Sequence, residues 1–389
     1  MTVTAPEPAV VTPAVGSRVL AVTGWGLLSG VATDPAQLGA VLVGGGPGPV
    51  DAGSLVEDPL PAPEAYALVD FRVRDHLGRK GTSFFDRATA LAMVAAKQAF
   101  ADSDLVVDDS NRDRVGIVFG TTAGSARSTS EYSRETFINE RPYLVNPLIF
   151  PNAVMNCAAG QAGIWYGLRG PNATVAAGSM SALNGLRYTR NLLACGYADA
   201  LLVGATEEFS AQSAWATRFA QQRAGGTTTV GEGSAMFVVE DAEAVRAAGR
   251  RMDAEILAVE VSLRDPAEAG AARAGLEECL RRALNRAGVG PEEVWAVATQ
   301  ENGMAALDAV EDGAVRAVLG EAPRRLRVKD HLGECHSATS VFQLAALFAL
   351  HRSDPALDGR ISVVTARSSD GAVGAAVVRG WSRAGGDLG

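Results

Sequence analysis

A serine at residue 179 stands in a sharp turn of small residues, Ala177-Gly178-Ser179, where a nucleophile could act. A short predicted strand, 173–175, comes before the turn, and an amphipathic segment that reaches Cys195 follows it. A residue that opens a helix in this way faces free backbone N–H groups and the positive end of the helix dipole. The pattern indicates either a nucleophilic hydroxyl or a helix N-cap, which is the commonest role of serine at such a position.

A second polar turn contains Glu334, between Gly333 and Cys335, and precedes a long apolar segment that ends at Leu350. Lys329 lies five residues earlier. A carboxylate near the start of a buried helix needs a partner, so Glu334 is expected to pair with Lys329 or with a backbone amide.

Asn302-Gly303 forms a third polar turn, and this pair is typical of a simple chain reversal. Two histidines flank Glu334, His331 three residues before it and His336 two residues after it. On a helix or a tight turn such offsets direct side chains away from each other, so we expect neither imidazole to serve the position of residue 334.

The elements that would position these residues occur twice. Two similar halves imply stacked sheets, with central helices whose N-termini converge on one pocket. The matching elements are helix 90–100 with 276–287, strand 115–119 with 294–298, turn 178–179 with 333–334, and strand 200–203 with 361–364.

Composition excludes several function classes. The chain has 389 residues and a net charge of −9, without a basic cluster interleaved with aromatics, so a nucleic-acid partner is not expected. Four scattered cysteines indicate neither a disulfide framework nor a metal site, no cofactor is indicated, and a reducing cytoplasm fits. No signal peptide or membrane-spanning run is evident. The predicted divisions are a flexible leader (1–17), an N-terminal half (18–241), a C-terminal half (242–381) and a tail (382–389).

Over nearly its whole length the chain resembles the β-ketoacyl synthases of the thiolase-like fold. The resemblance implies an α/β protein whose duplicated βαβ halves form five layers, α-β-α-β-α. The motifs that carry it are Val22-Thr23-Gly24-Trp25-Gly26, Phe85-Asp86-Arg87-Ala88, Tyr166-Gly167-Leu168-Arg169-Gly170-Pro171, Gly196 to Glu207, and Gly231-Glu232-Gly233-Ser234-Ala235.

In that family a cysteine nucleophile and two histidines condense acyl and malonyl thioesters. Here the resemblance places Ser179 at the cysteine, Asn302 and Glu334 at the two histidines, and Lys329 at the family's lysine. A hydroxyl is far less acidic than a thiol and needs a general base, which neither substituted position provides. An ionised glutamate only accepts hydrogen bonds and would repel a developing enolate oxygen. The three substitutions argue against condensation by this chain alone.

A synthase-like chain without the Cys-His-His set resembles the chain-length factor of type II polyketide systems. That resemblance implies a heterodimer with a Cys-containing ketosynthase, an acyl carrier protein as second partner, and a tunnel bounded by residues 126–137. Tyr132 and Phe137 are the predicted blockers, with ordinary interface packing as their alternative role. The other functions that stay open are a Ser179-dependent acyltransferase acting on carrier thioesters and a scaffold that only binds the carrier.

Overall fold

The computed structural model describes residues 18–383. The predicted leader, 1–17, lies outside the described residues, as do residues 384–389 of the predicted tail. Ten strands form a continuous sheet in the order β11-β10-β12-β13-β9-β1-β8-β6-β4-β5. Its two halves meet where β1 and β9 pair over only three residues, Leu20–Val22 with Ala254–Ile256.

The first half of the sheet is built by the N-terminal part of the chain, where β4, β5 and β6 run parallel. Its strands are β1 (Leu20–Ser29), β4 (Val115–Thr121), β5 (Asn172–Ala176), β6 (Ala200–Glu207) and β8 (Gly233–Asp241). The helices of this part are α1 (Pro35–Gly44), α2 (Val73–Leu77), α3 (Arg87–Asp102), α4 (Ala126–Ile138), α5 (Cys157–Tyr166), α6 (Ser181–Ala194), α7 (Ala211–Ala224) and α8 (Ala242–Ala247).

The second half of the sheet repeats this arrangement, with β10, β11 and β12 parallel. Its strands are β9 (Ala254–Leu263), β10 (Val294–Thr299), β11 (Arg324–Arg327), β12 (Ile361–Arg367) and β13 (Ala372–Gly380). Its helices are α9 (Ala271–Ala287), α10 (Ala305–Leu319), α11 (Lys329–Leu332) and α12 (Thr339–Ser353). A small separate sheet joins β2 (Val50–Asp51), β3 (Glu64–Tyr66) and β7 (Val230–Gly231).

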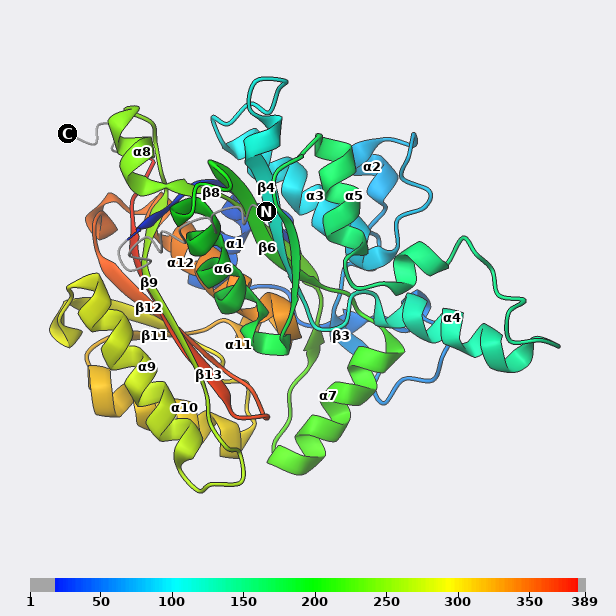
Figure 1. Ribbon diagram of the computed structural model, residues 1–389. Helices are drawn as coiled ribbons and strands as arrows, with labels where there is room; N and C mark the ends of the chain where they lie inside the picture. The colour runs from blue at the N-terminus through cyan, green and yellow to red at the C-terminus, as the bar shows by residue number, and fades with distance from the viewer. Residues whose placement is uncertain (1–17, 384–389) are drawn as a thin grey trace, which may run out of the picture.

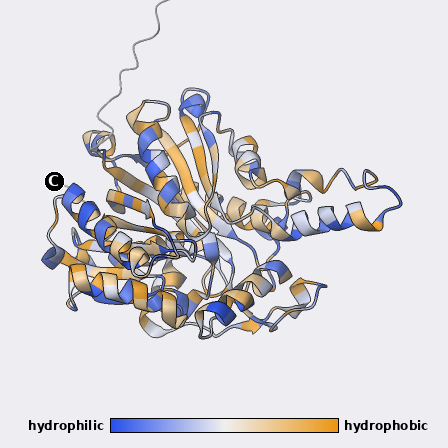
Figure 2. Ribbon diagram, turned by 60° about the horizontal axis from the view of Figure 1, so that its bottom comes forward, coloured by the Kyte–Doolittle hydropathy of each residue, from blue (hydrophilic) through white to orange (hydrophobic). Residues whose placement is uncertain are grey.

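Helices α6 and α12 contact each other between the two halves of the sheet, α3 and α5 cover the outer face of the first half, and α9 and α10 lie outside the second (Figure 1). The predicted five-layer thiolase-like α/β fold is therefore confirmed. Helix α12 is buried along almost its whole length, because it lies between the two halves of the sheet and has no solvent face. Figure 2 shows that the strands inside the molecule are mostly hydrophobic, whereas the outer helices carry both hydrophobic and hydrophilic residues. The division at residues 241 and 242 stays a prediction.

Local sequence explains where two of these helices begin. Asp34 caps α1, with Pro35 at its first position, and Asp86 caps α3. Helix α4 projects from the body of the molecule (Figure 1). Among residues 18–383, no helix combines the length and apolar composition that crossing a bilayer requires.

Candidate functional site

A cavity of about 280 Å³ gathers the predicted site residues at the N-terminal ends of the two central helices. Ser179 comes from the turn before α6, Asn302 follows β10, and Lys329 begins α11. Glu334 and His336 come from the turn before α12. Residues far apart in the sequence therefore meet as the duplicated fold requires.

The Ser179 side chain is oriented away from the helix amides. A 3₁₀ turn, Gly178–Met180, precedes α6, and the Ser179 hydroxyl donates to the backbone carbonyl of Arg367 at 2.6 Å. The expectation that Ser179 is an N-cap is wrong, because its oxygen accepts from no helix N–H among the described residues. Instead the Ser181 hydroxyl accepts from Ala177 N–H, at 2.9 Å. The Ser179 proton is already engaged by a carbonyl, which is too weak a base to remove it.

Glu334 is the most heavily bonded group in the cavity, and its predicted partners are confirmed. Its Oε2 accepts from Lys329 Nζ at 2.5 Å and from Asn302 Nδ2 at 2.8 Å. Its Oε1 accepts from the His336 backbone N–H at 3.0 Å. The Glu334 and Lys329 side chains are 9% and 4% exposed, so this ion pair is shielded from water.

These contacts fix the charge of the carboxyl group. Burial alone would raise the pKa of Glu334, but the Lys329 charge, His336 and the hydrogen bonds lower it to about 2. Glu334 is therefore ionised at neutral pH. The Asn302 amide points one N–H at it and accepts from Met304 N–H, at 3.2 Å, with Oδ1.

The expectation that His336 points away from the site is wrong. His336 lines the cavity, and its Nε2 lies 3.1 Å from the Thr217 hydroxyl. The reason is its backbone: His336 has φ 42°, the one positive φ at a non-glycine position between residues 18 and 383. With this backbone conformation the imidazole points into the cavity rather than away from it. Histidine adopts a positive φ more readily than most residues.

The turn before α6 and the turn before α12 correspond in the two halves of the chain, but not at the residues that the sequence predicted. The 3₁₀ turn His336–Ala338 immediately precedes α12, as Gly178–Met180 precedes α6, so His336 (φ 42°) matches Gly178 (φ 51°). The predicted match of residues 178–179 with 333–334 is therefore wrong by three residues. The position that corresponds to Ser179 is Ser337, whose hydroxyl lies 2.6 Å from Glu207 Oε2 and 3.1 Å from the carbonyl of Thr206, at the end of β6.

Sequence reasoning missed the buried polar network behind Ser179. Arg367 Nε lies 3.1 Å from Glu311, and its Nη2 lies 2.6 Å from Asp308. Gln300 accepts from the Arg367 backbone N–H at 3.2 Å. These contacts hold the Arg367 carbonyl that accepts the hydrogen bond from Ser179. Arg367 ends an otherwise apolar strand, and a charged residue at that point of the sequence could have indicated a buried polar network.

Tyr132 and Phe137 lie on α4 and do not line the Ser179 cavity. Tyr132 packs on Phe150, with ring centroids 5.7 Å apart. Phe137 is 86% exposed on the projecting end of the helix. Neither residue therefore bounds the Ser179 cavity within this chain, and either could bound an acyl tunnel only together with a partner chain.

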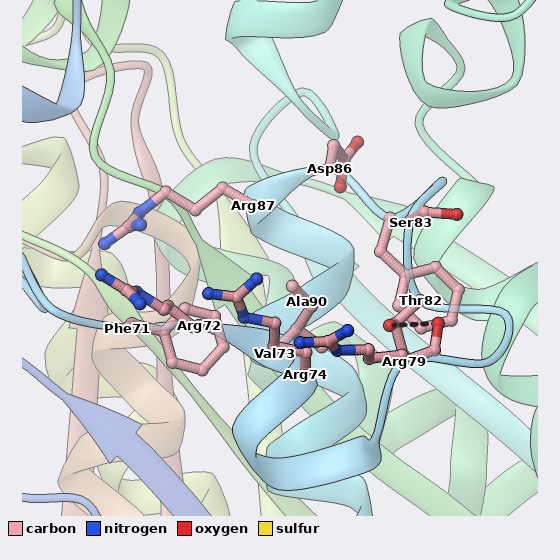
Figure 3. Close-up of a pocket in the computed structure, with 11 residues that line it drawn as sticks. Phe71, Arg72, Val73, Arg74, Arg79, Thr82, Ser83, Asp86, Arg87 and Ala90 are labelled. Carbon is pink, nitrogen blue, oxygen red and sulfur yellow. Dashed lines mark hydrogen bonds between the residues drawn. The ribbon is translucent and has the colours of Figure 1, made fainter.

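A larger cavity, of about 600 Å³, lies between α2 and the start of α3, and no sequence pattern pointed to it. Four arginines line it, Arg72, Arg74, Arg79 and Arg87, and Figure 3 shows their side chains together with Phe71. Arg87 is held by Glu232 at 2.5 Å. Within residues 18–383, Arg72 and Arg79 form no side-chain hydrogen bond or ion pair, so this cavity carries positive charge in an acidic protein.

Comparison with known proteins agrees with this geometry. Residues 17–244 match the family model "Beta-ketoacyl synthase, N-terminal domain", and residues 254–353 match "Beta-ketoacyl synthase, C-terminal domain". The chain belongs to the β-ketoacyl synthase family.

Individual relatives span almost the full chain. The 3-oxoacyl-[acyl-carrier-protein] synthase 2 of Staphylococcus aureus (strain N315) is 27% identical over 90% of this chain and 89% of its own length. A solved structure, the ishigamide ketosynthase/chain length factor, is 34% identical with a TM-score of 0.81, and the match covers 93% of this chain and 99% of that one. A type II polyketide synthase carrier protein in complex with its ketosynthase matches at 17% identity with a TM-score of 0.73, covering 94% and 99%, which shows the fold alone.

Proposed function

We propose that this chain is a chain-length factor that does not itself catalyse condensation. In this role it pairs with a Cys-containing ketosynthase of a type II polyketide system and bounds the acyl tunnel for a polyketide or polyene chain. The observation that carries the proposal is the buried Glu334 carboxylate, ionised by Lys329, at the position where the family resemblance expects a histidine.

The chemistry of the cavity supports this role. Decarboxylation of a malonyl thioester places negative charge on an enolate oxygen, which hydrogen-bond donors must stabilise. Glu334 brings a negative charge instead, and one Asn302 N–H is already directed at it. The Ser179 hydroxyl donates to a carbonyl rather than to a base, so a thioester would meet no activated nucleophile.

The projecting helix α4 supports the partner role. Phe137 leaves 86% of its surface uncovered, and an exposed aromatic on a projecting helix is typical of residues buried by another protein. We infer that Tyr132 and Phe137 meet the acyl chain or the ketosynthase across the interface. The 34% identical structure, the ishigamide ketosynthase/chain length factor, supports the same assembly.

An acyl carrier protein is the second proposed partner, and the cytoplasm the proposed location. The cationic cavity of Figure 3 supports a carrier, because exposed guanidinium groups attract acidic partners and phosphorylated prosthetic groups. The carrier found in complex with a ketosynthase in one structural neighbour is consistent with this assignment.

The test is whether the chain has activity alone. Purified protein is incubated with malonylated and with acylated carrier protein, and carbon dioxide release and covalent transfer are measured by isotope and mass spectrometry. The same measurements follow after co-expression with a Cys-containing ketosynthase homologue. We expect neither activity from the chain alone, and condensation only from the co-purified pair.

One observation favours a second function, a Ser179-dependent acyltransferase, because His336 lines the cavity that contains Ser179. An oxygen ester on Ser179, abolished by Ser179→Ala and by His336→Ala, would establish that activity and overturn the chain-length-factor role. We expect no ester, since His336 Nε2 contacts Thr217 rather than Ser179.

A further inference from the structure

A third cavity, of about 440 Å³, lies between α4 and the start of α3 and contains a buried acid. Glu208, one residue past the end of β6, is 2% exposed. Its Oε1 accepts from the Ser125 hydroxyl at 2.9 Å and from the Arg127 backbone N–H at 3.1 Å. Its Oε2 has no hydrogen-bond partner among the described residues. An unpartnered buried carboxyl oxygen is costly, so its retention calls for a ligand.

A second acid faces the same space. Asp86 lines this cavity with Glu208, and its Oδ1 accepts from Thr89 N–H at 2.7 Å. No basic side chain of residues 18–383 forms an ion pair with either carboxyl group, and the charges of Asp86 and Glu207 both disfavour ionisation of Glu208. Burial first, and then the Asp86 charge, raise the pKa of Glu208 to about 8; burial also raises the pKa of Asp86.

The two arginines that line the cavity are engaged elsewhere. Arg127 Nε donates to Glu131 at 2.7 Å, so its hydrogen bond to Glu208 comes from the backbone and its charge acts on Glu208 only from a distance. Arg87 binds Glu232 through Nε, at 2.7 Å. Within residues 18–383 no cation is therefore in direct contact with either carboxyl group.

The rim shows what kind of molecule brings a cation to this cavity. Phe84 and Leu148 line the cavity and are 65% and 68% exposed, and nearby Phe150 is 53% exposed. Exposed apolar side chains gathered around a pocket mark a protein-binding face rather than a site for a free ion.

We propose that a lysine or arginine side chain of the partner ketosynthase inserts into this cavity and forms an ion pair with Glu208 and Asp86. The inference rests on the proposed function, since it needs the heterodimer. In the free chain Glu208 keeps a proton; the incoming cation favours the carboxylate, and the proton leaves to solvent. The apolar rim closes over the pair and excludes water.

The experiment measures both binding and the proton. Association of this chain with its ketosynthase partner is followed by calorimetry at pH 7 in two buffers of different ionisation enthalpy. With a pKa of about 8, Glu208 is mostly protonated at pH 7, so the wild-type chain should release close to one proton per heterodimer, roughly 0.9. Glu208→Gln should release none and should weaken the heterodimer on the order of 30-fold or more.

Glu131→Gln is the matched control, because it removes an acid from the same cavity that is half exposed and already paired with Arg127. Its heterodimer affinity should change less than threefold, with proton release intact. A denaturation midpoint of Glu208→Gln at or above wild type shows that the variant folds, so that weak binding is not misfolding.

The outcomes separate the two proposals. If Glu208→Gln leaves both the affinity of the heterodimer and its proton release unchanged, the inference is overturned. The proposed function stands in that case, because the heterodimer still forms. If the isolated chain binds n-butylammonium with loss of one proton while the heterodimer releases none, the occupant is a small cation and the inference is overturned. Failure of the wild-type chain to pair with any Cys-containing ketosynthase overturns the proposed function itself.

Discussion

The cavity around Ser179 and the cavity beside α4 each contain a deeply buried glutamate, and the two acids have opposite proton affinities. Glu334 has a pKa of about 2 and Glu208 one of about 8, although both are withdrawn from water. Burial raises the pKa in both places. The difference comes from the neighbours, because Glu334 meets Lys329 at 2.5 Å whereas Glu208 meets the acids Asp86 and Glu207.

The comparison shows which cavity pairs its acids with cations of the same chain. At Ser179 each of three acids contacts a cation, since Lys329 faces Glu334, and Arg367 faces Asp308 and Glu311. Beside α4 neither Glu208 nor Asp86 forms an ion pair with a side chain of residues 18–383, so a cation that contacts them has to come from elsewhere.

The largest expected effect comes from removing the counterion of Glu334. Lys329→Met leaves a buried carboxylate without its cation, so the free energy of unfolding at pH 7 should fall by about 3–5 kcal/mol. Urea denaturation measures it. The double variant Lys329→Met with Glu334→Gln should recover at least half of the loss, and a single-variant loss below about 1 kcal/mol would contradict this account of the pair.

A pH series on Glu334→Gln tests the same group by linkage. The folded-state pKa of about 2 lies below the ordinary value of 4.5, so the wild-type advantage is complete above pH 4.5 and disappears as the pH falls toward 2. The difference in unfolding free energy between wild type and Glu334→Gln should shrink by roughly 3 kcal/mol over that window. A difference that stays constant between pH 5 and pH 3 would show that Glu334 is not held ionised.

The same substitution at Glu208 should have the opposite pH dependence. The folded-state pKa of Glu208, about 8, lies above the ordinary value of 4.5, so between these values the folded chain binds a proton that the unfolded chain has lost. The stability of the wild-type chain therefore falls as the pH rises from 4.5 toward 8. Glu208→Gln should therefore gain roughly 3 kcal/mol relative to wild type between pH 4.5 and pH 7 in the isolated chain. If the unfolding free energies of wild type and Glu208→Gln changed with pH in parallel, Glu208 would not have a raised pKa and the two cavities would not differ in this respect.

The smallest effect on the chain itself is expected at the exposed end of α4. Phe137→Ala should change the unfolding free energy by less than about 0.5 kcal/mol, because 86% of the ring is already in water. In the heterodimer the same variant should shift the product toward longer chains, measured by mass spectrometry. Arg134→Ala, another exposed position of α4, is the control and should leave the products unchanged.

Local sequence signals were sufficient for the elements that carry them. Asp34 with Pro35, and Asp86, fixed two helix starts, because capping depends on neighbours in the chain. The repeated helices and strands, together with the family motifs, predicted the five layers. Convergence of the central helices predicted that Ser179 and Glu334 share one pocket, and the family resemblance added Asn302 to it.

What depends on contacts between distant segments could not be predicted. The positive φ of His336, and with it the place of its ring in the cavity, could not be read from the neighbouring residues. The carbonyl that accepts the hydrogen bond of the Ser179 hydroxyl belongs to Arg367, 188 residues away. Glu208 looks like any glutamate after an apolar strand, and only the packing of α3 and α4 around it leaves it buried without a cation. A side chain's charge is written in the sequence, but its compensation depends on which segments the fold brings within a few ångströms of it.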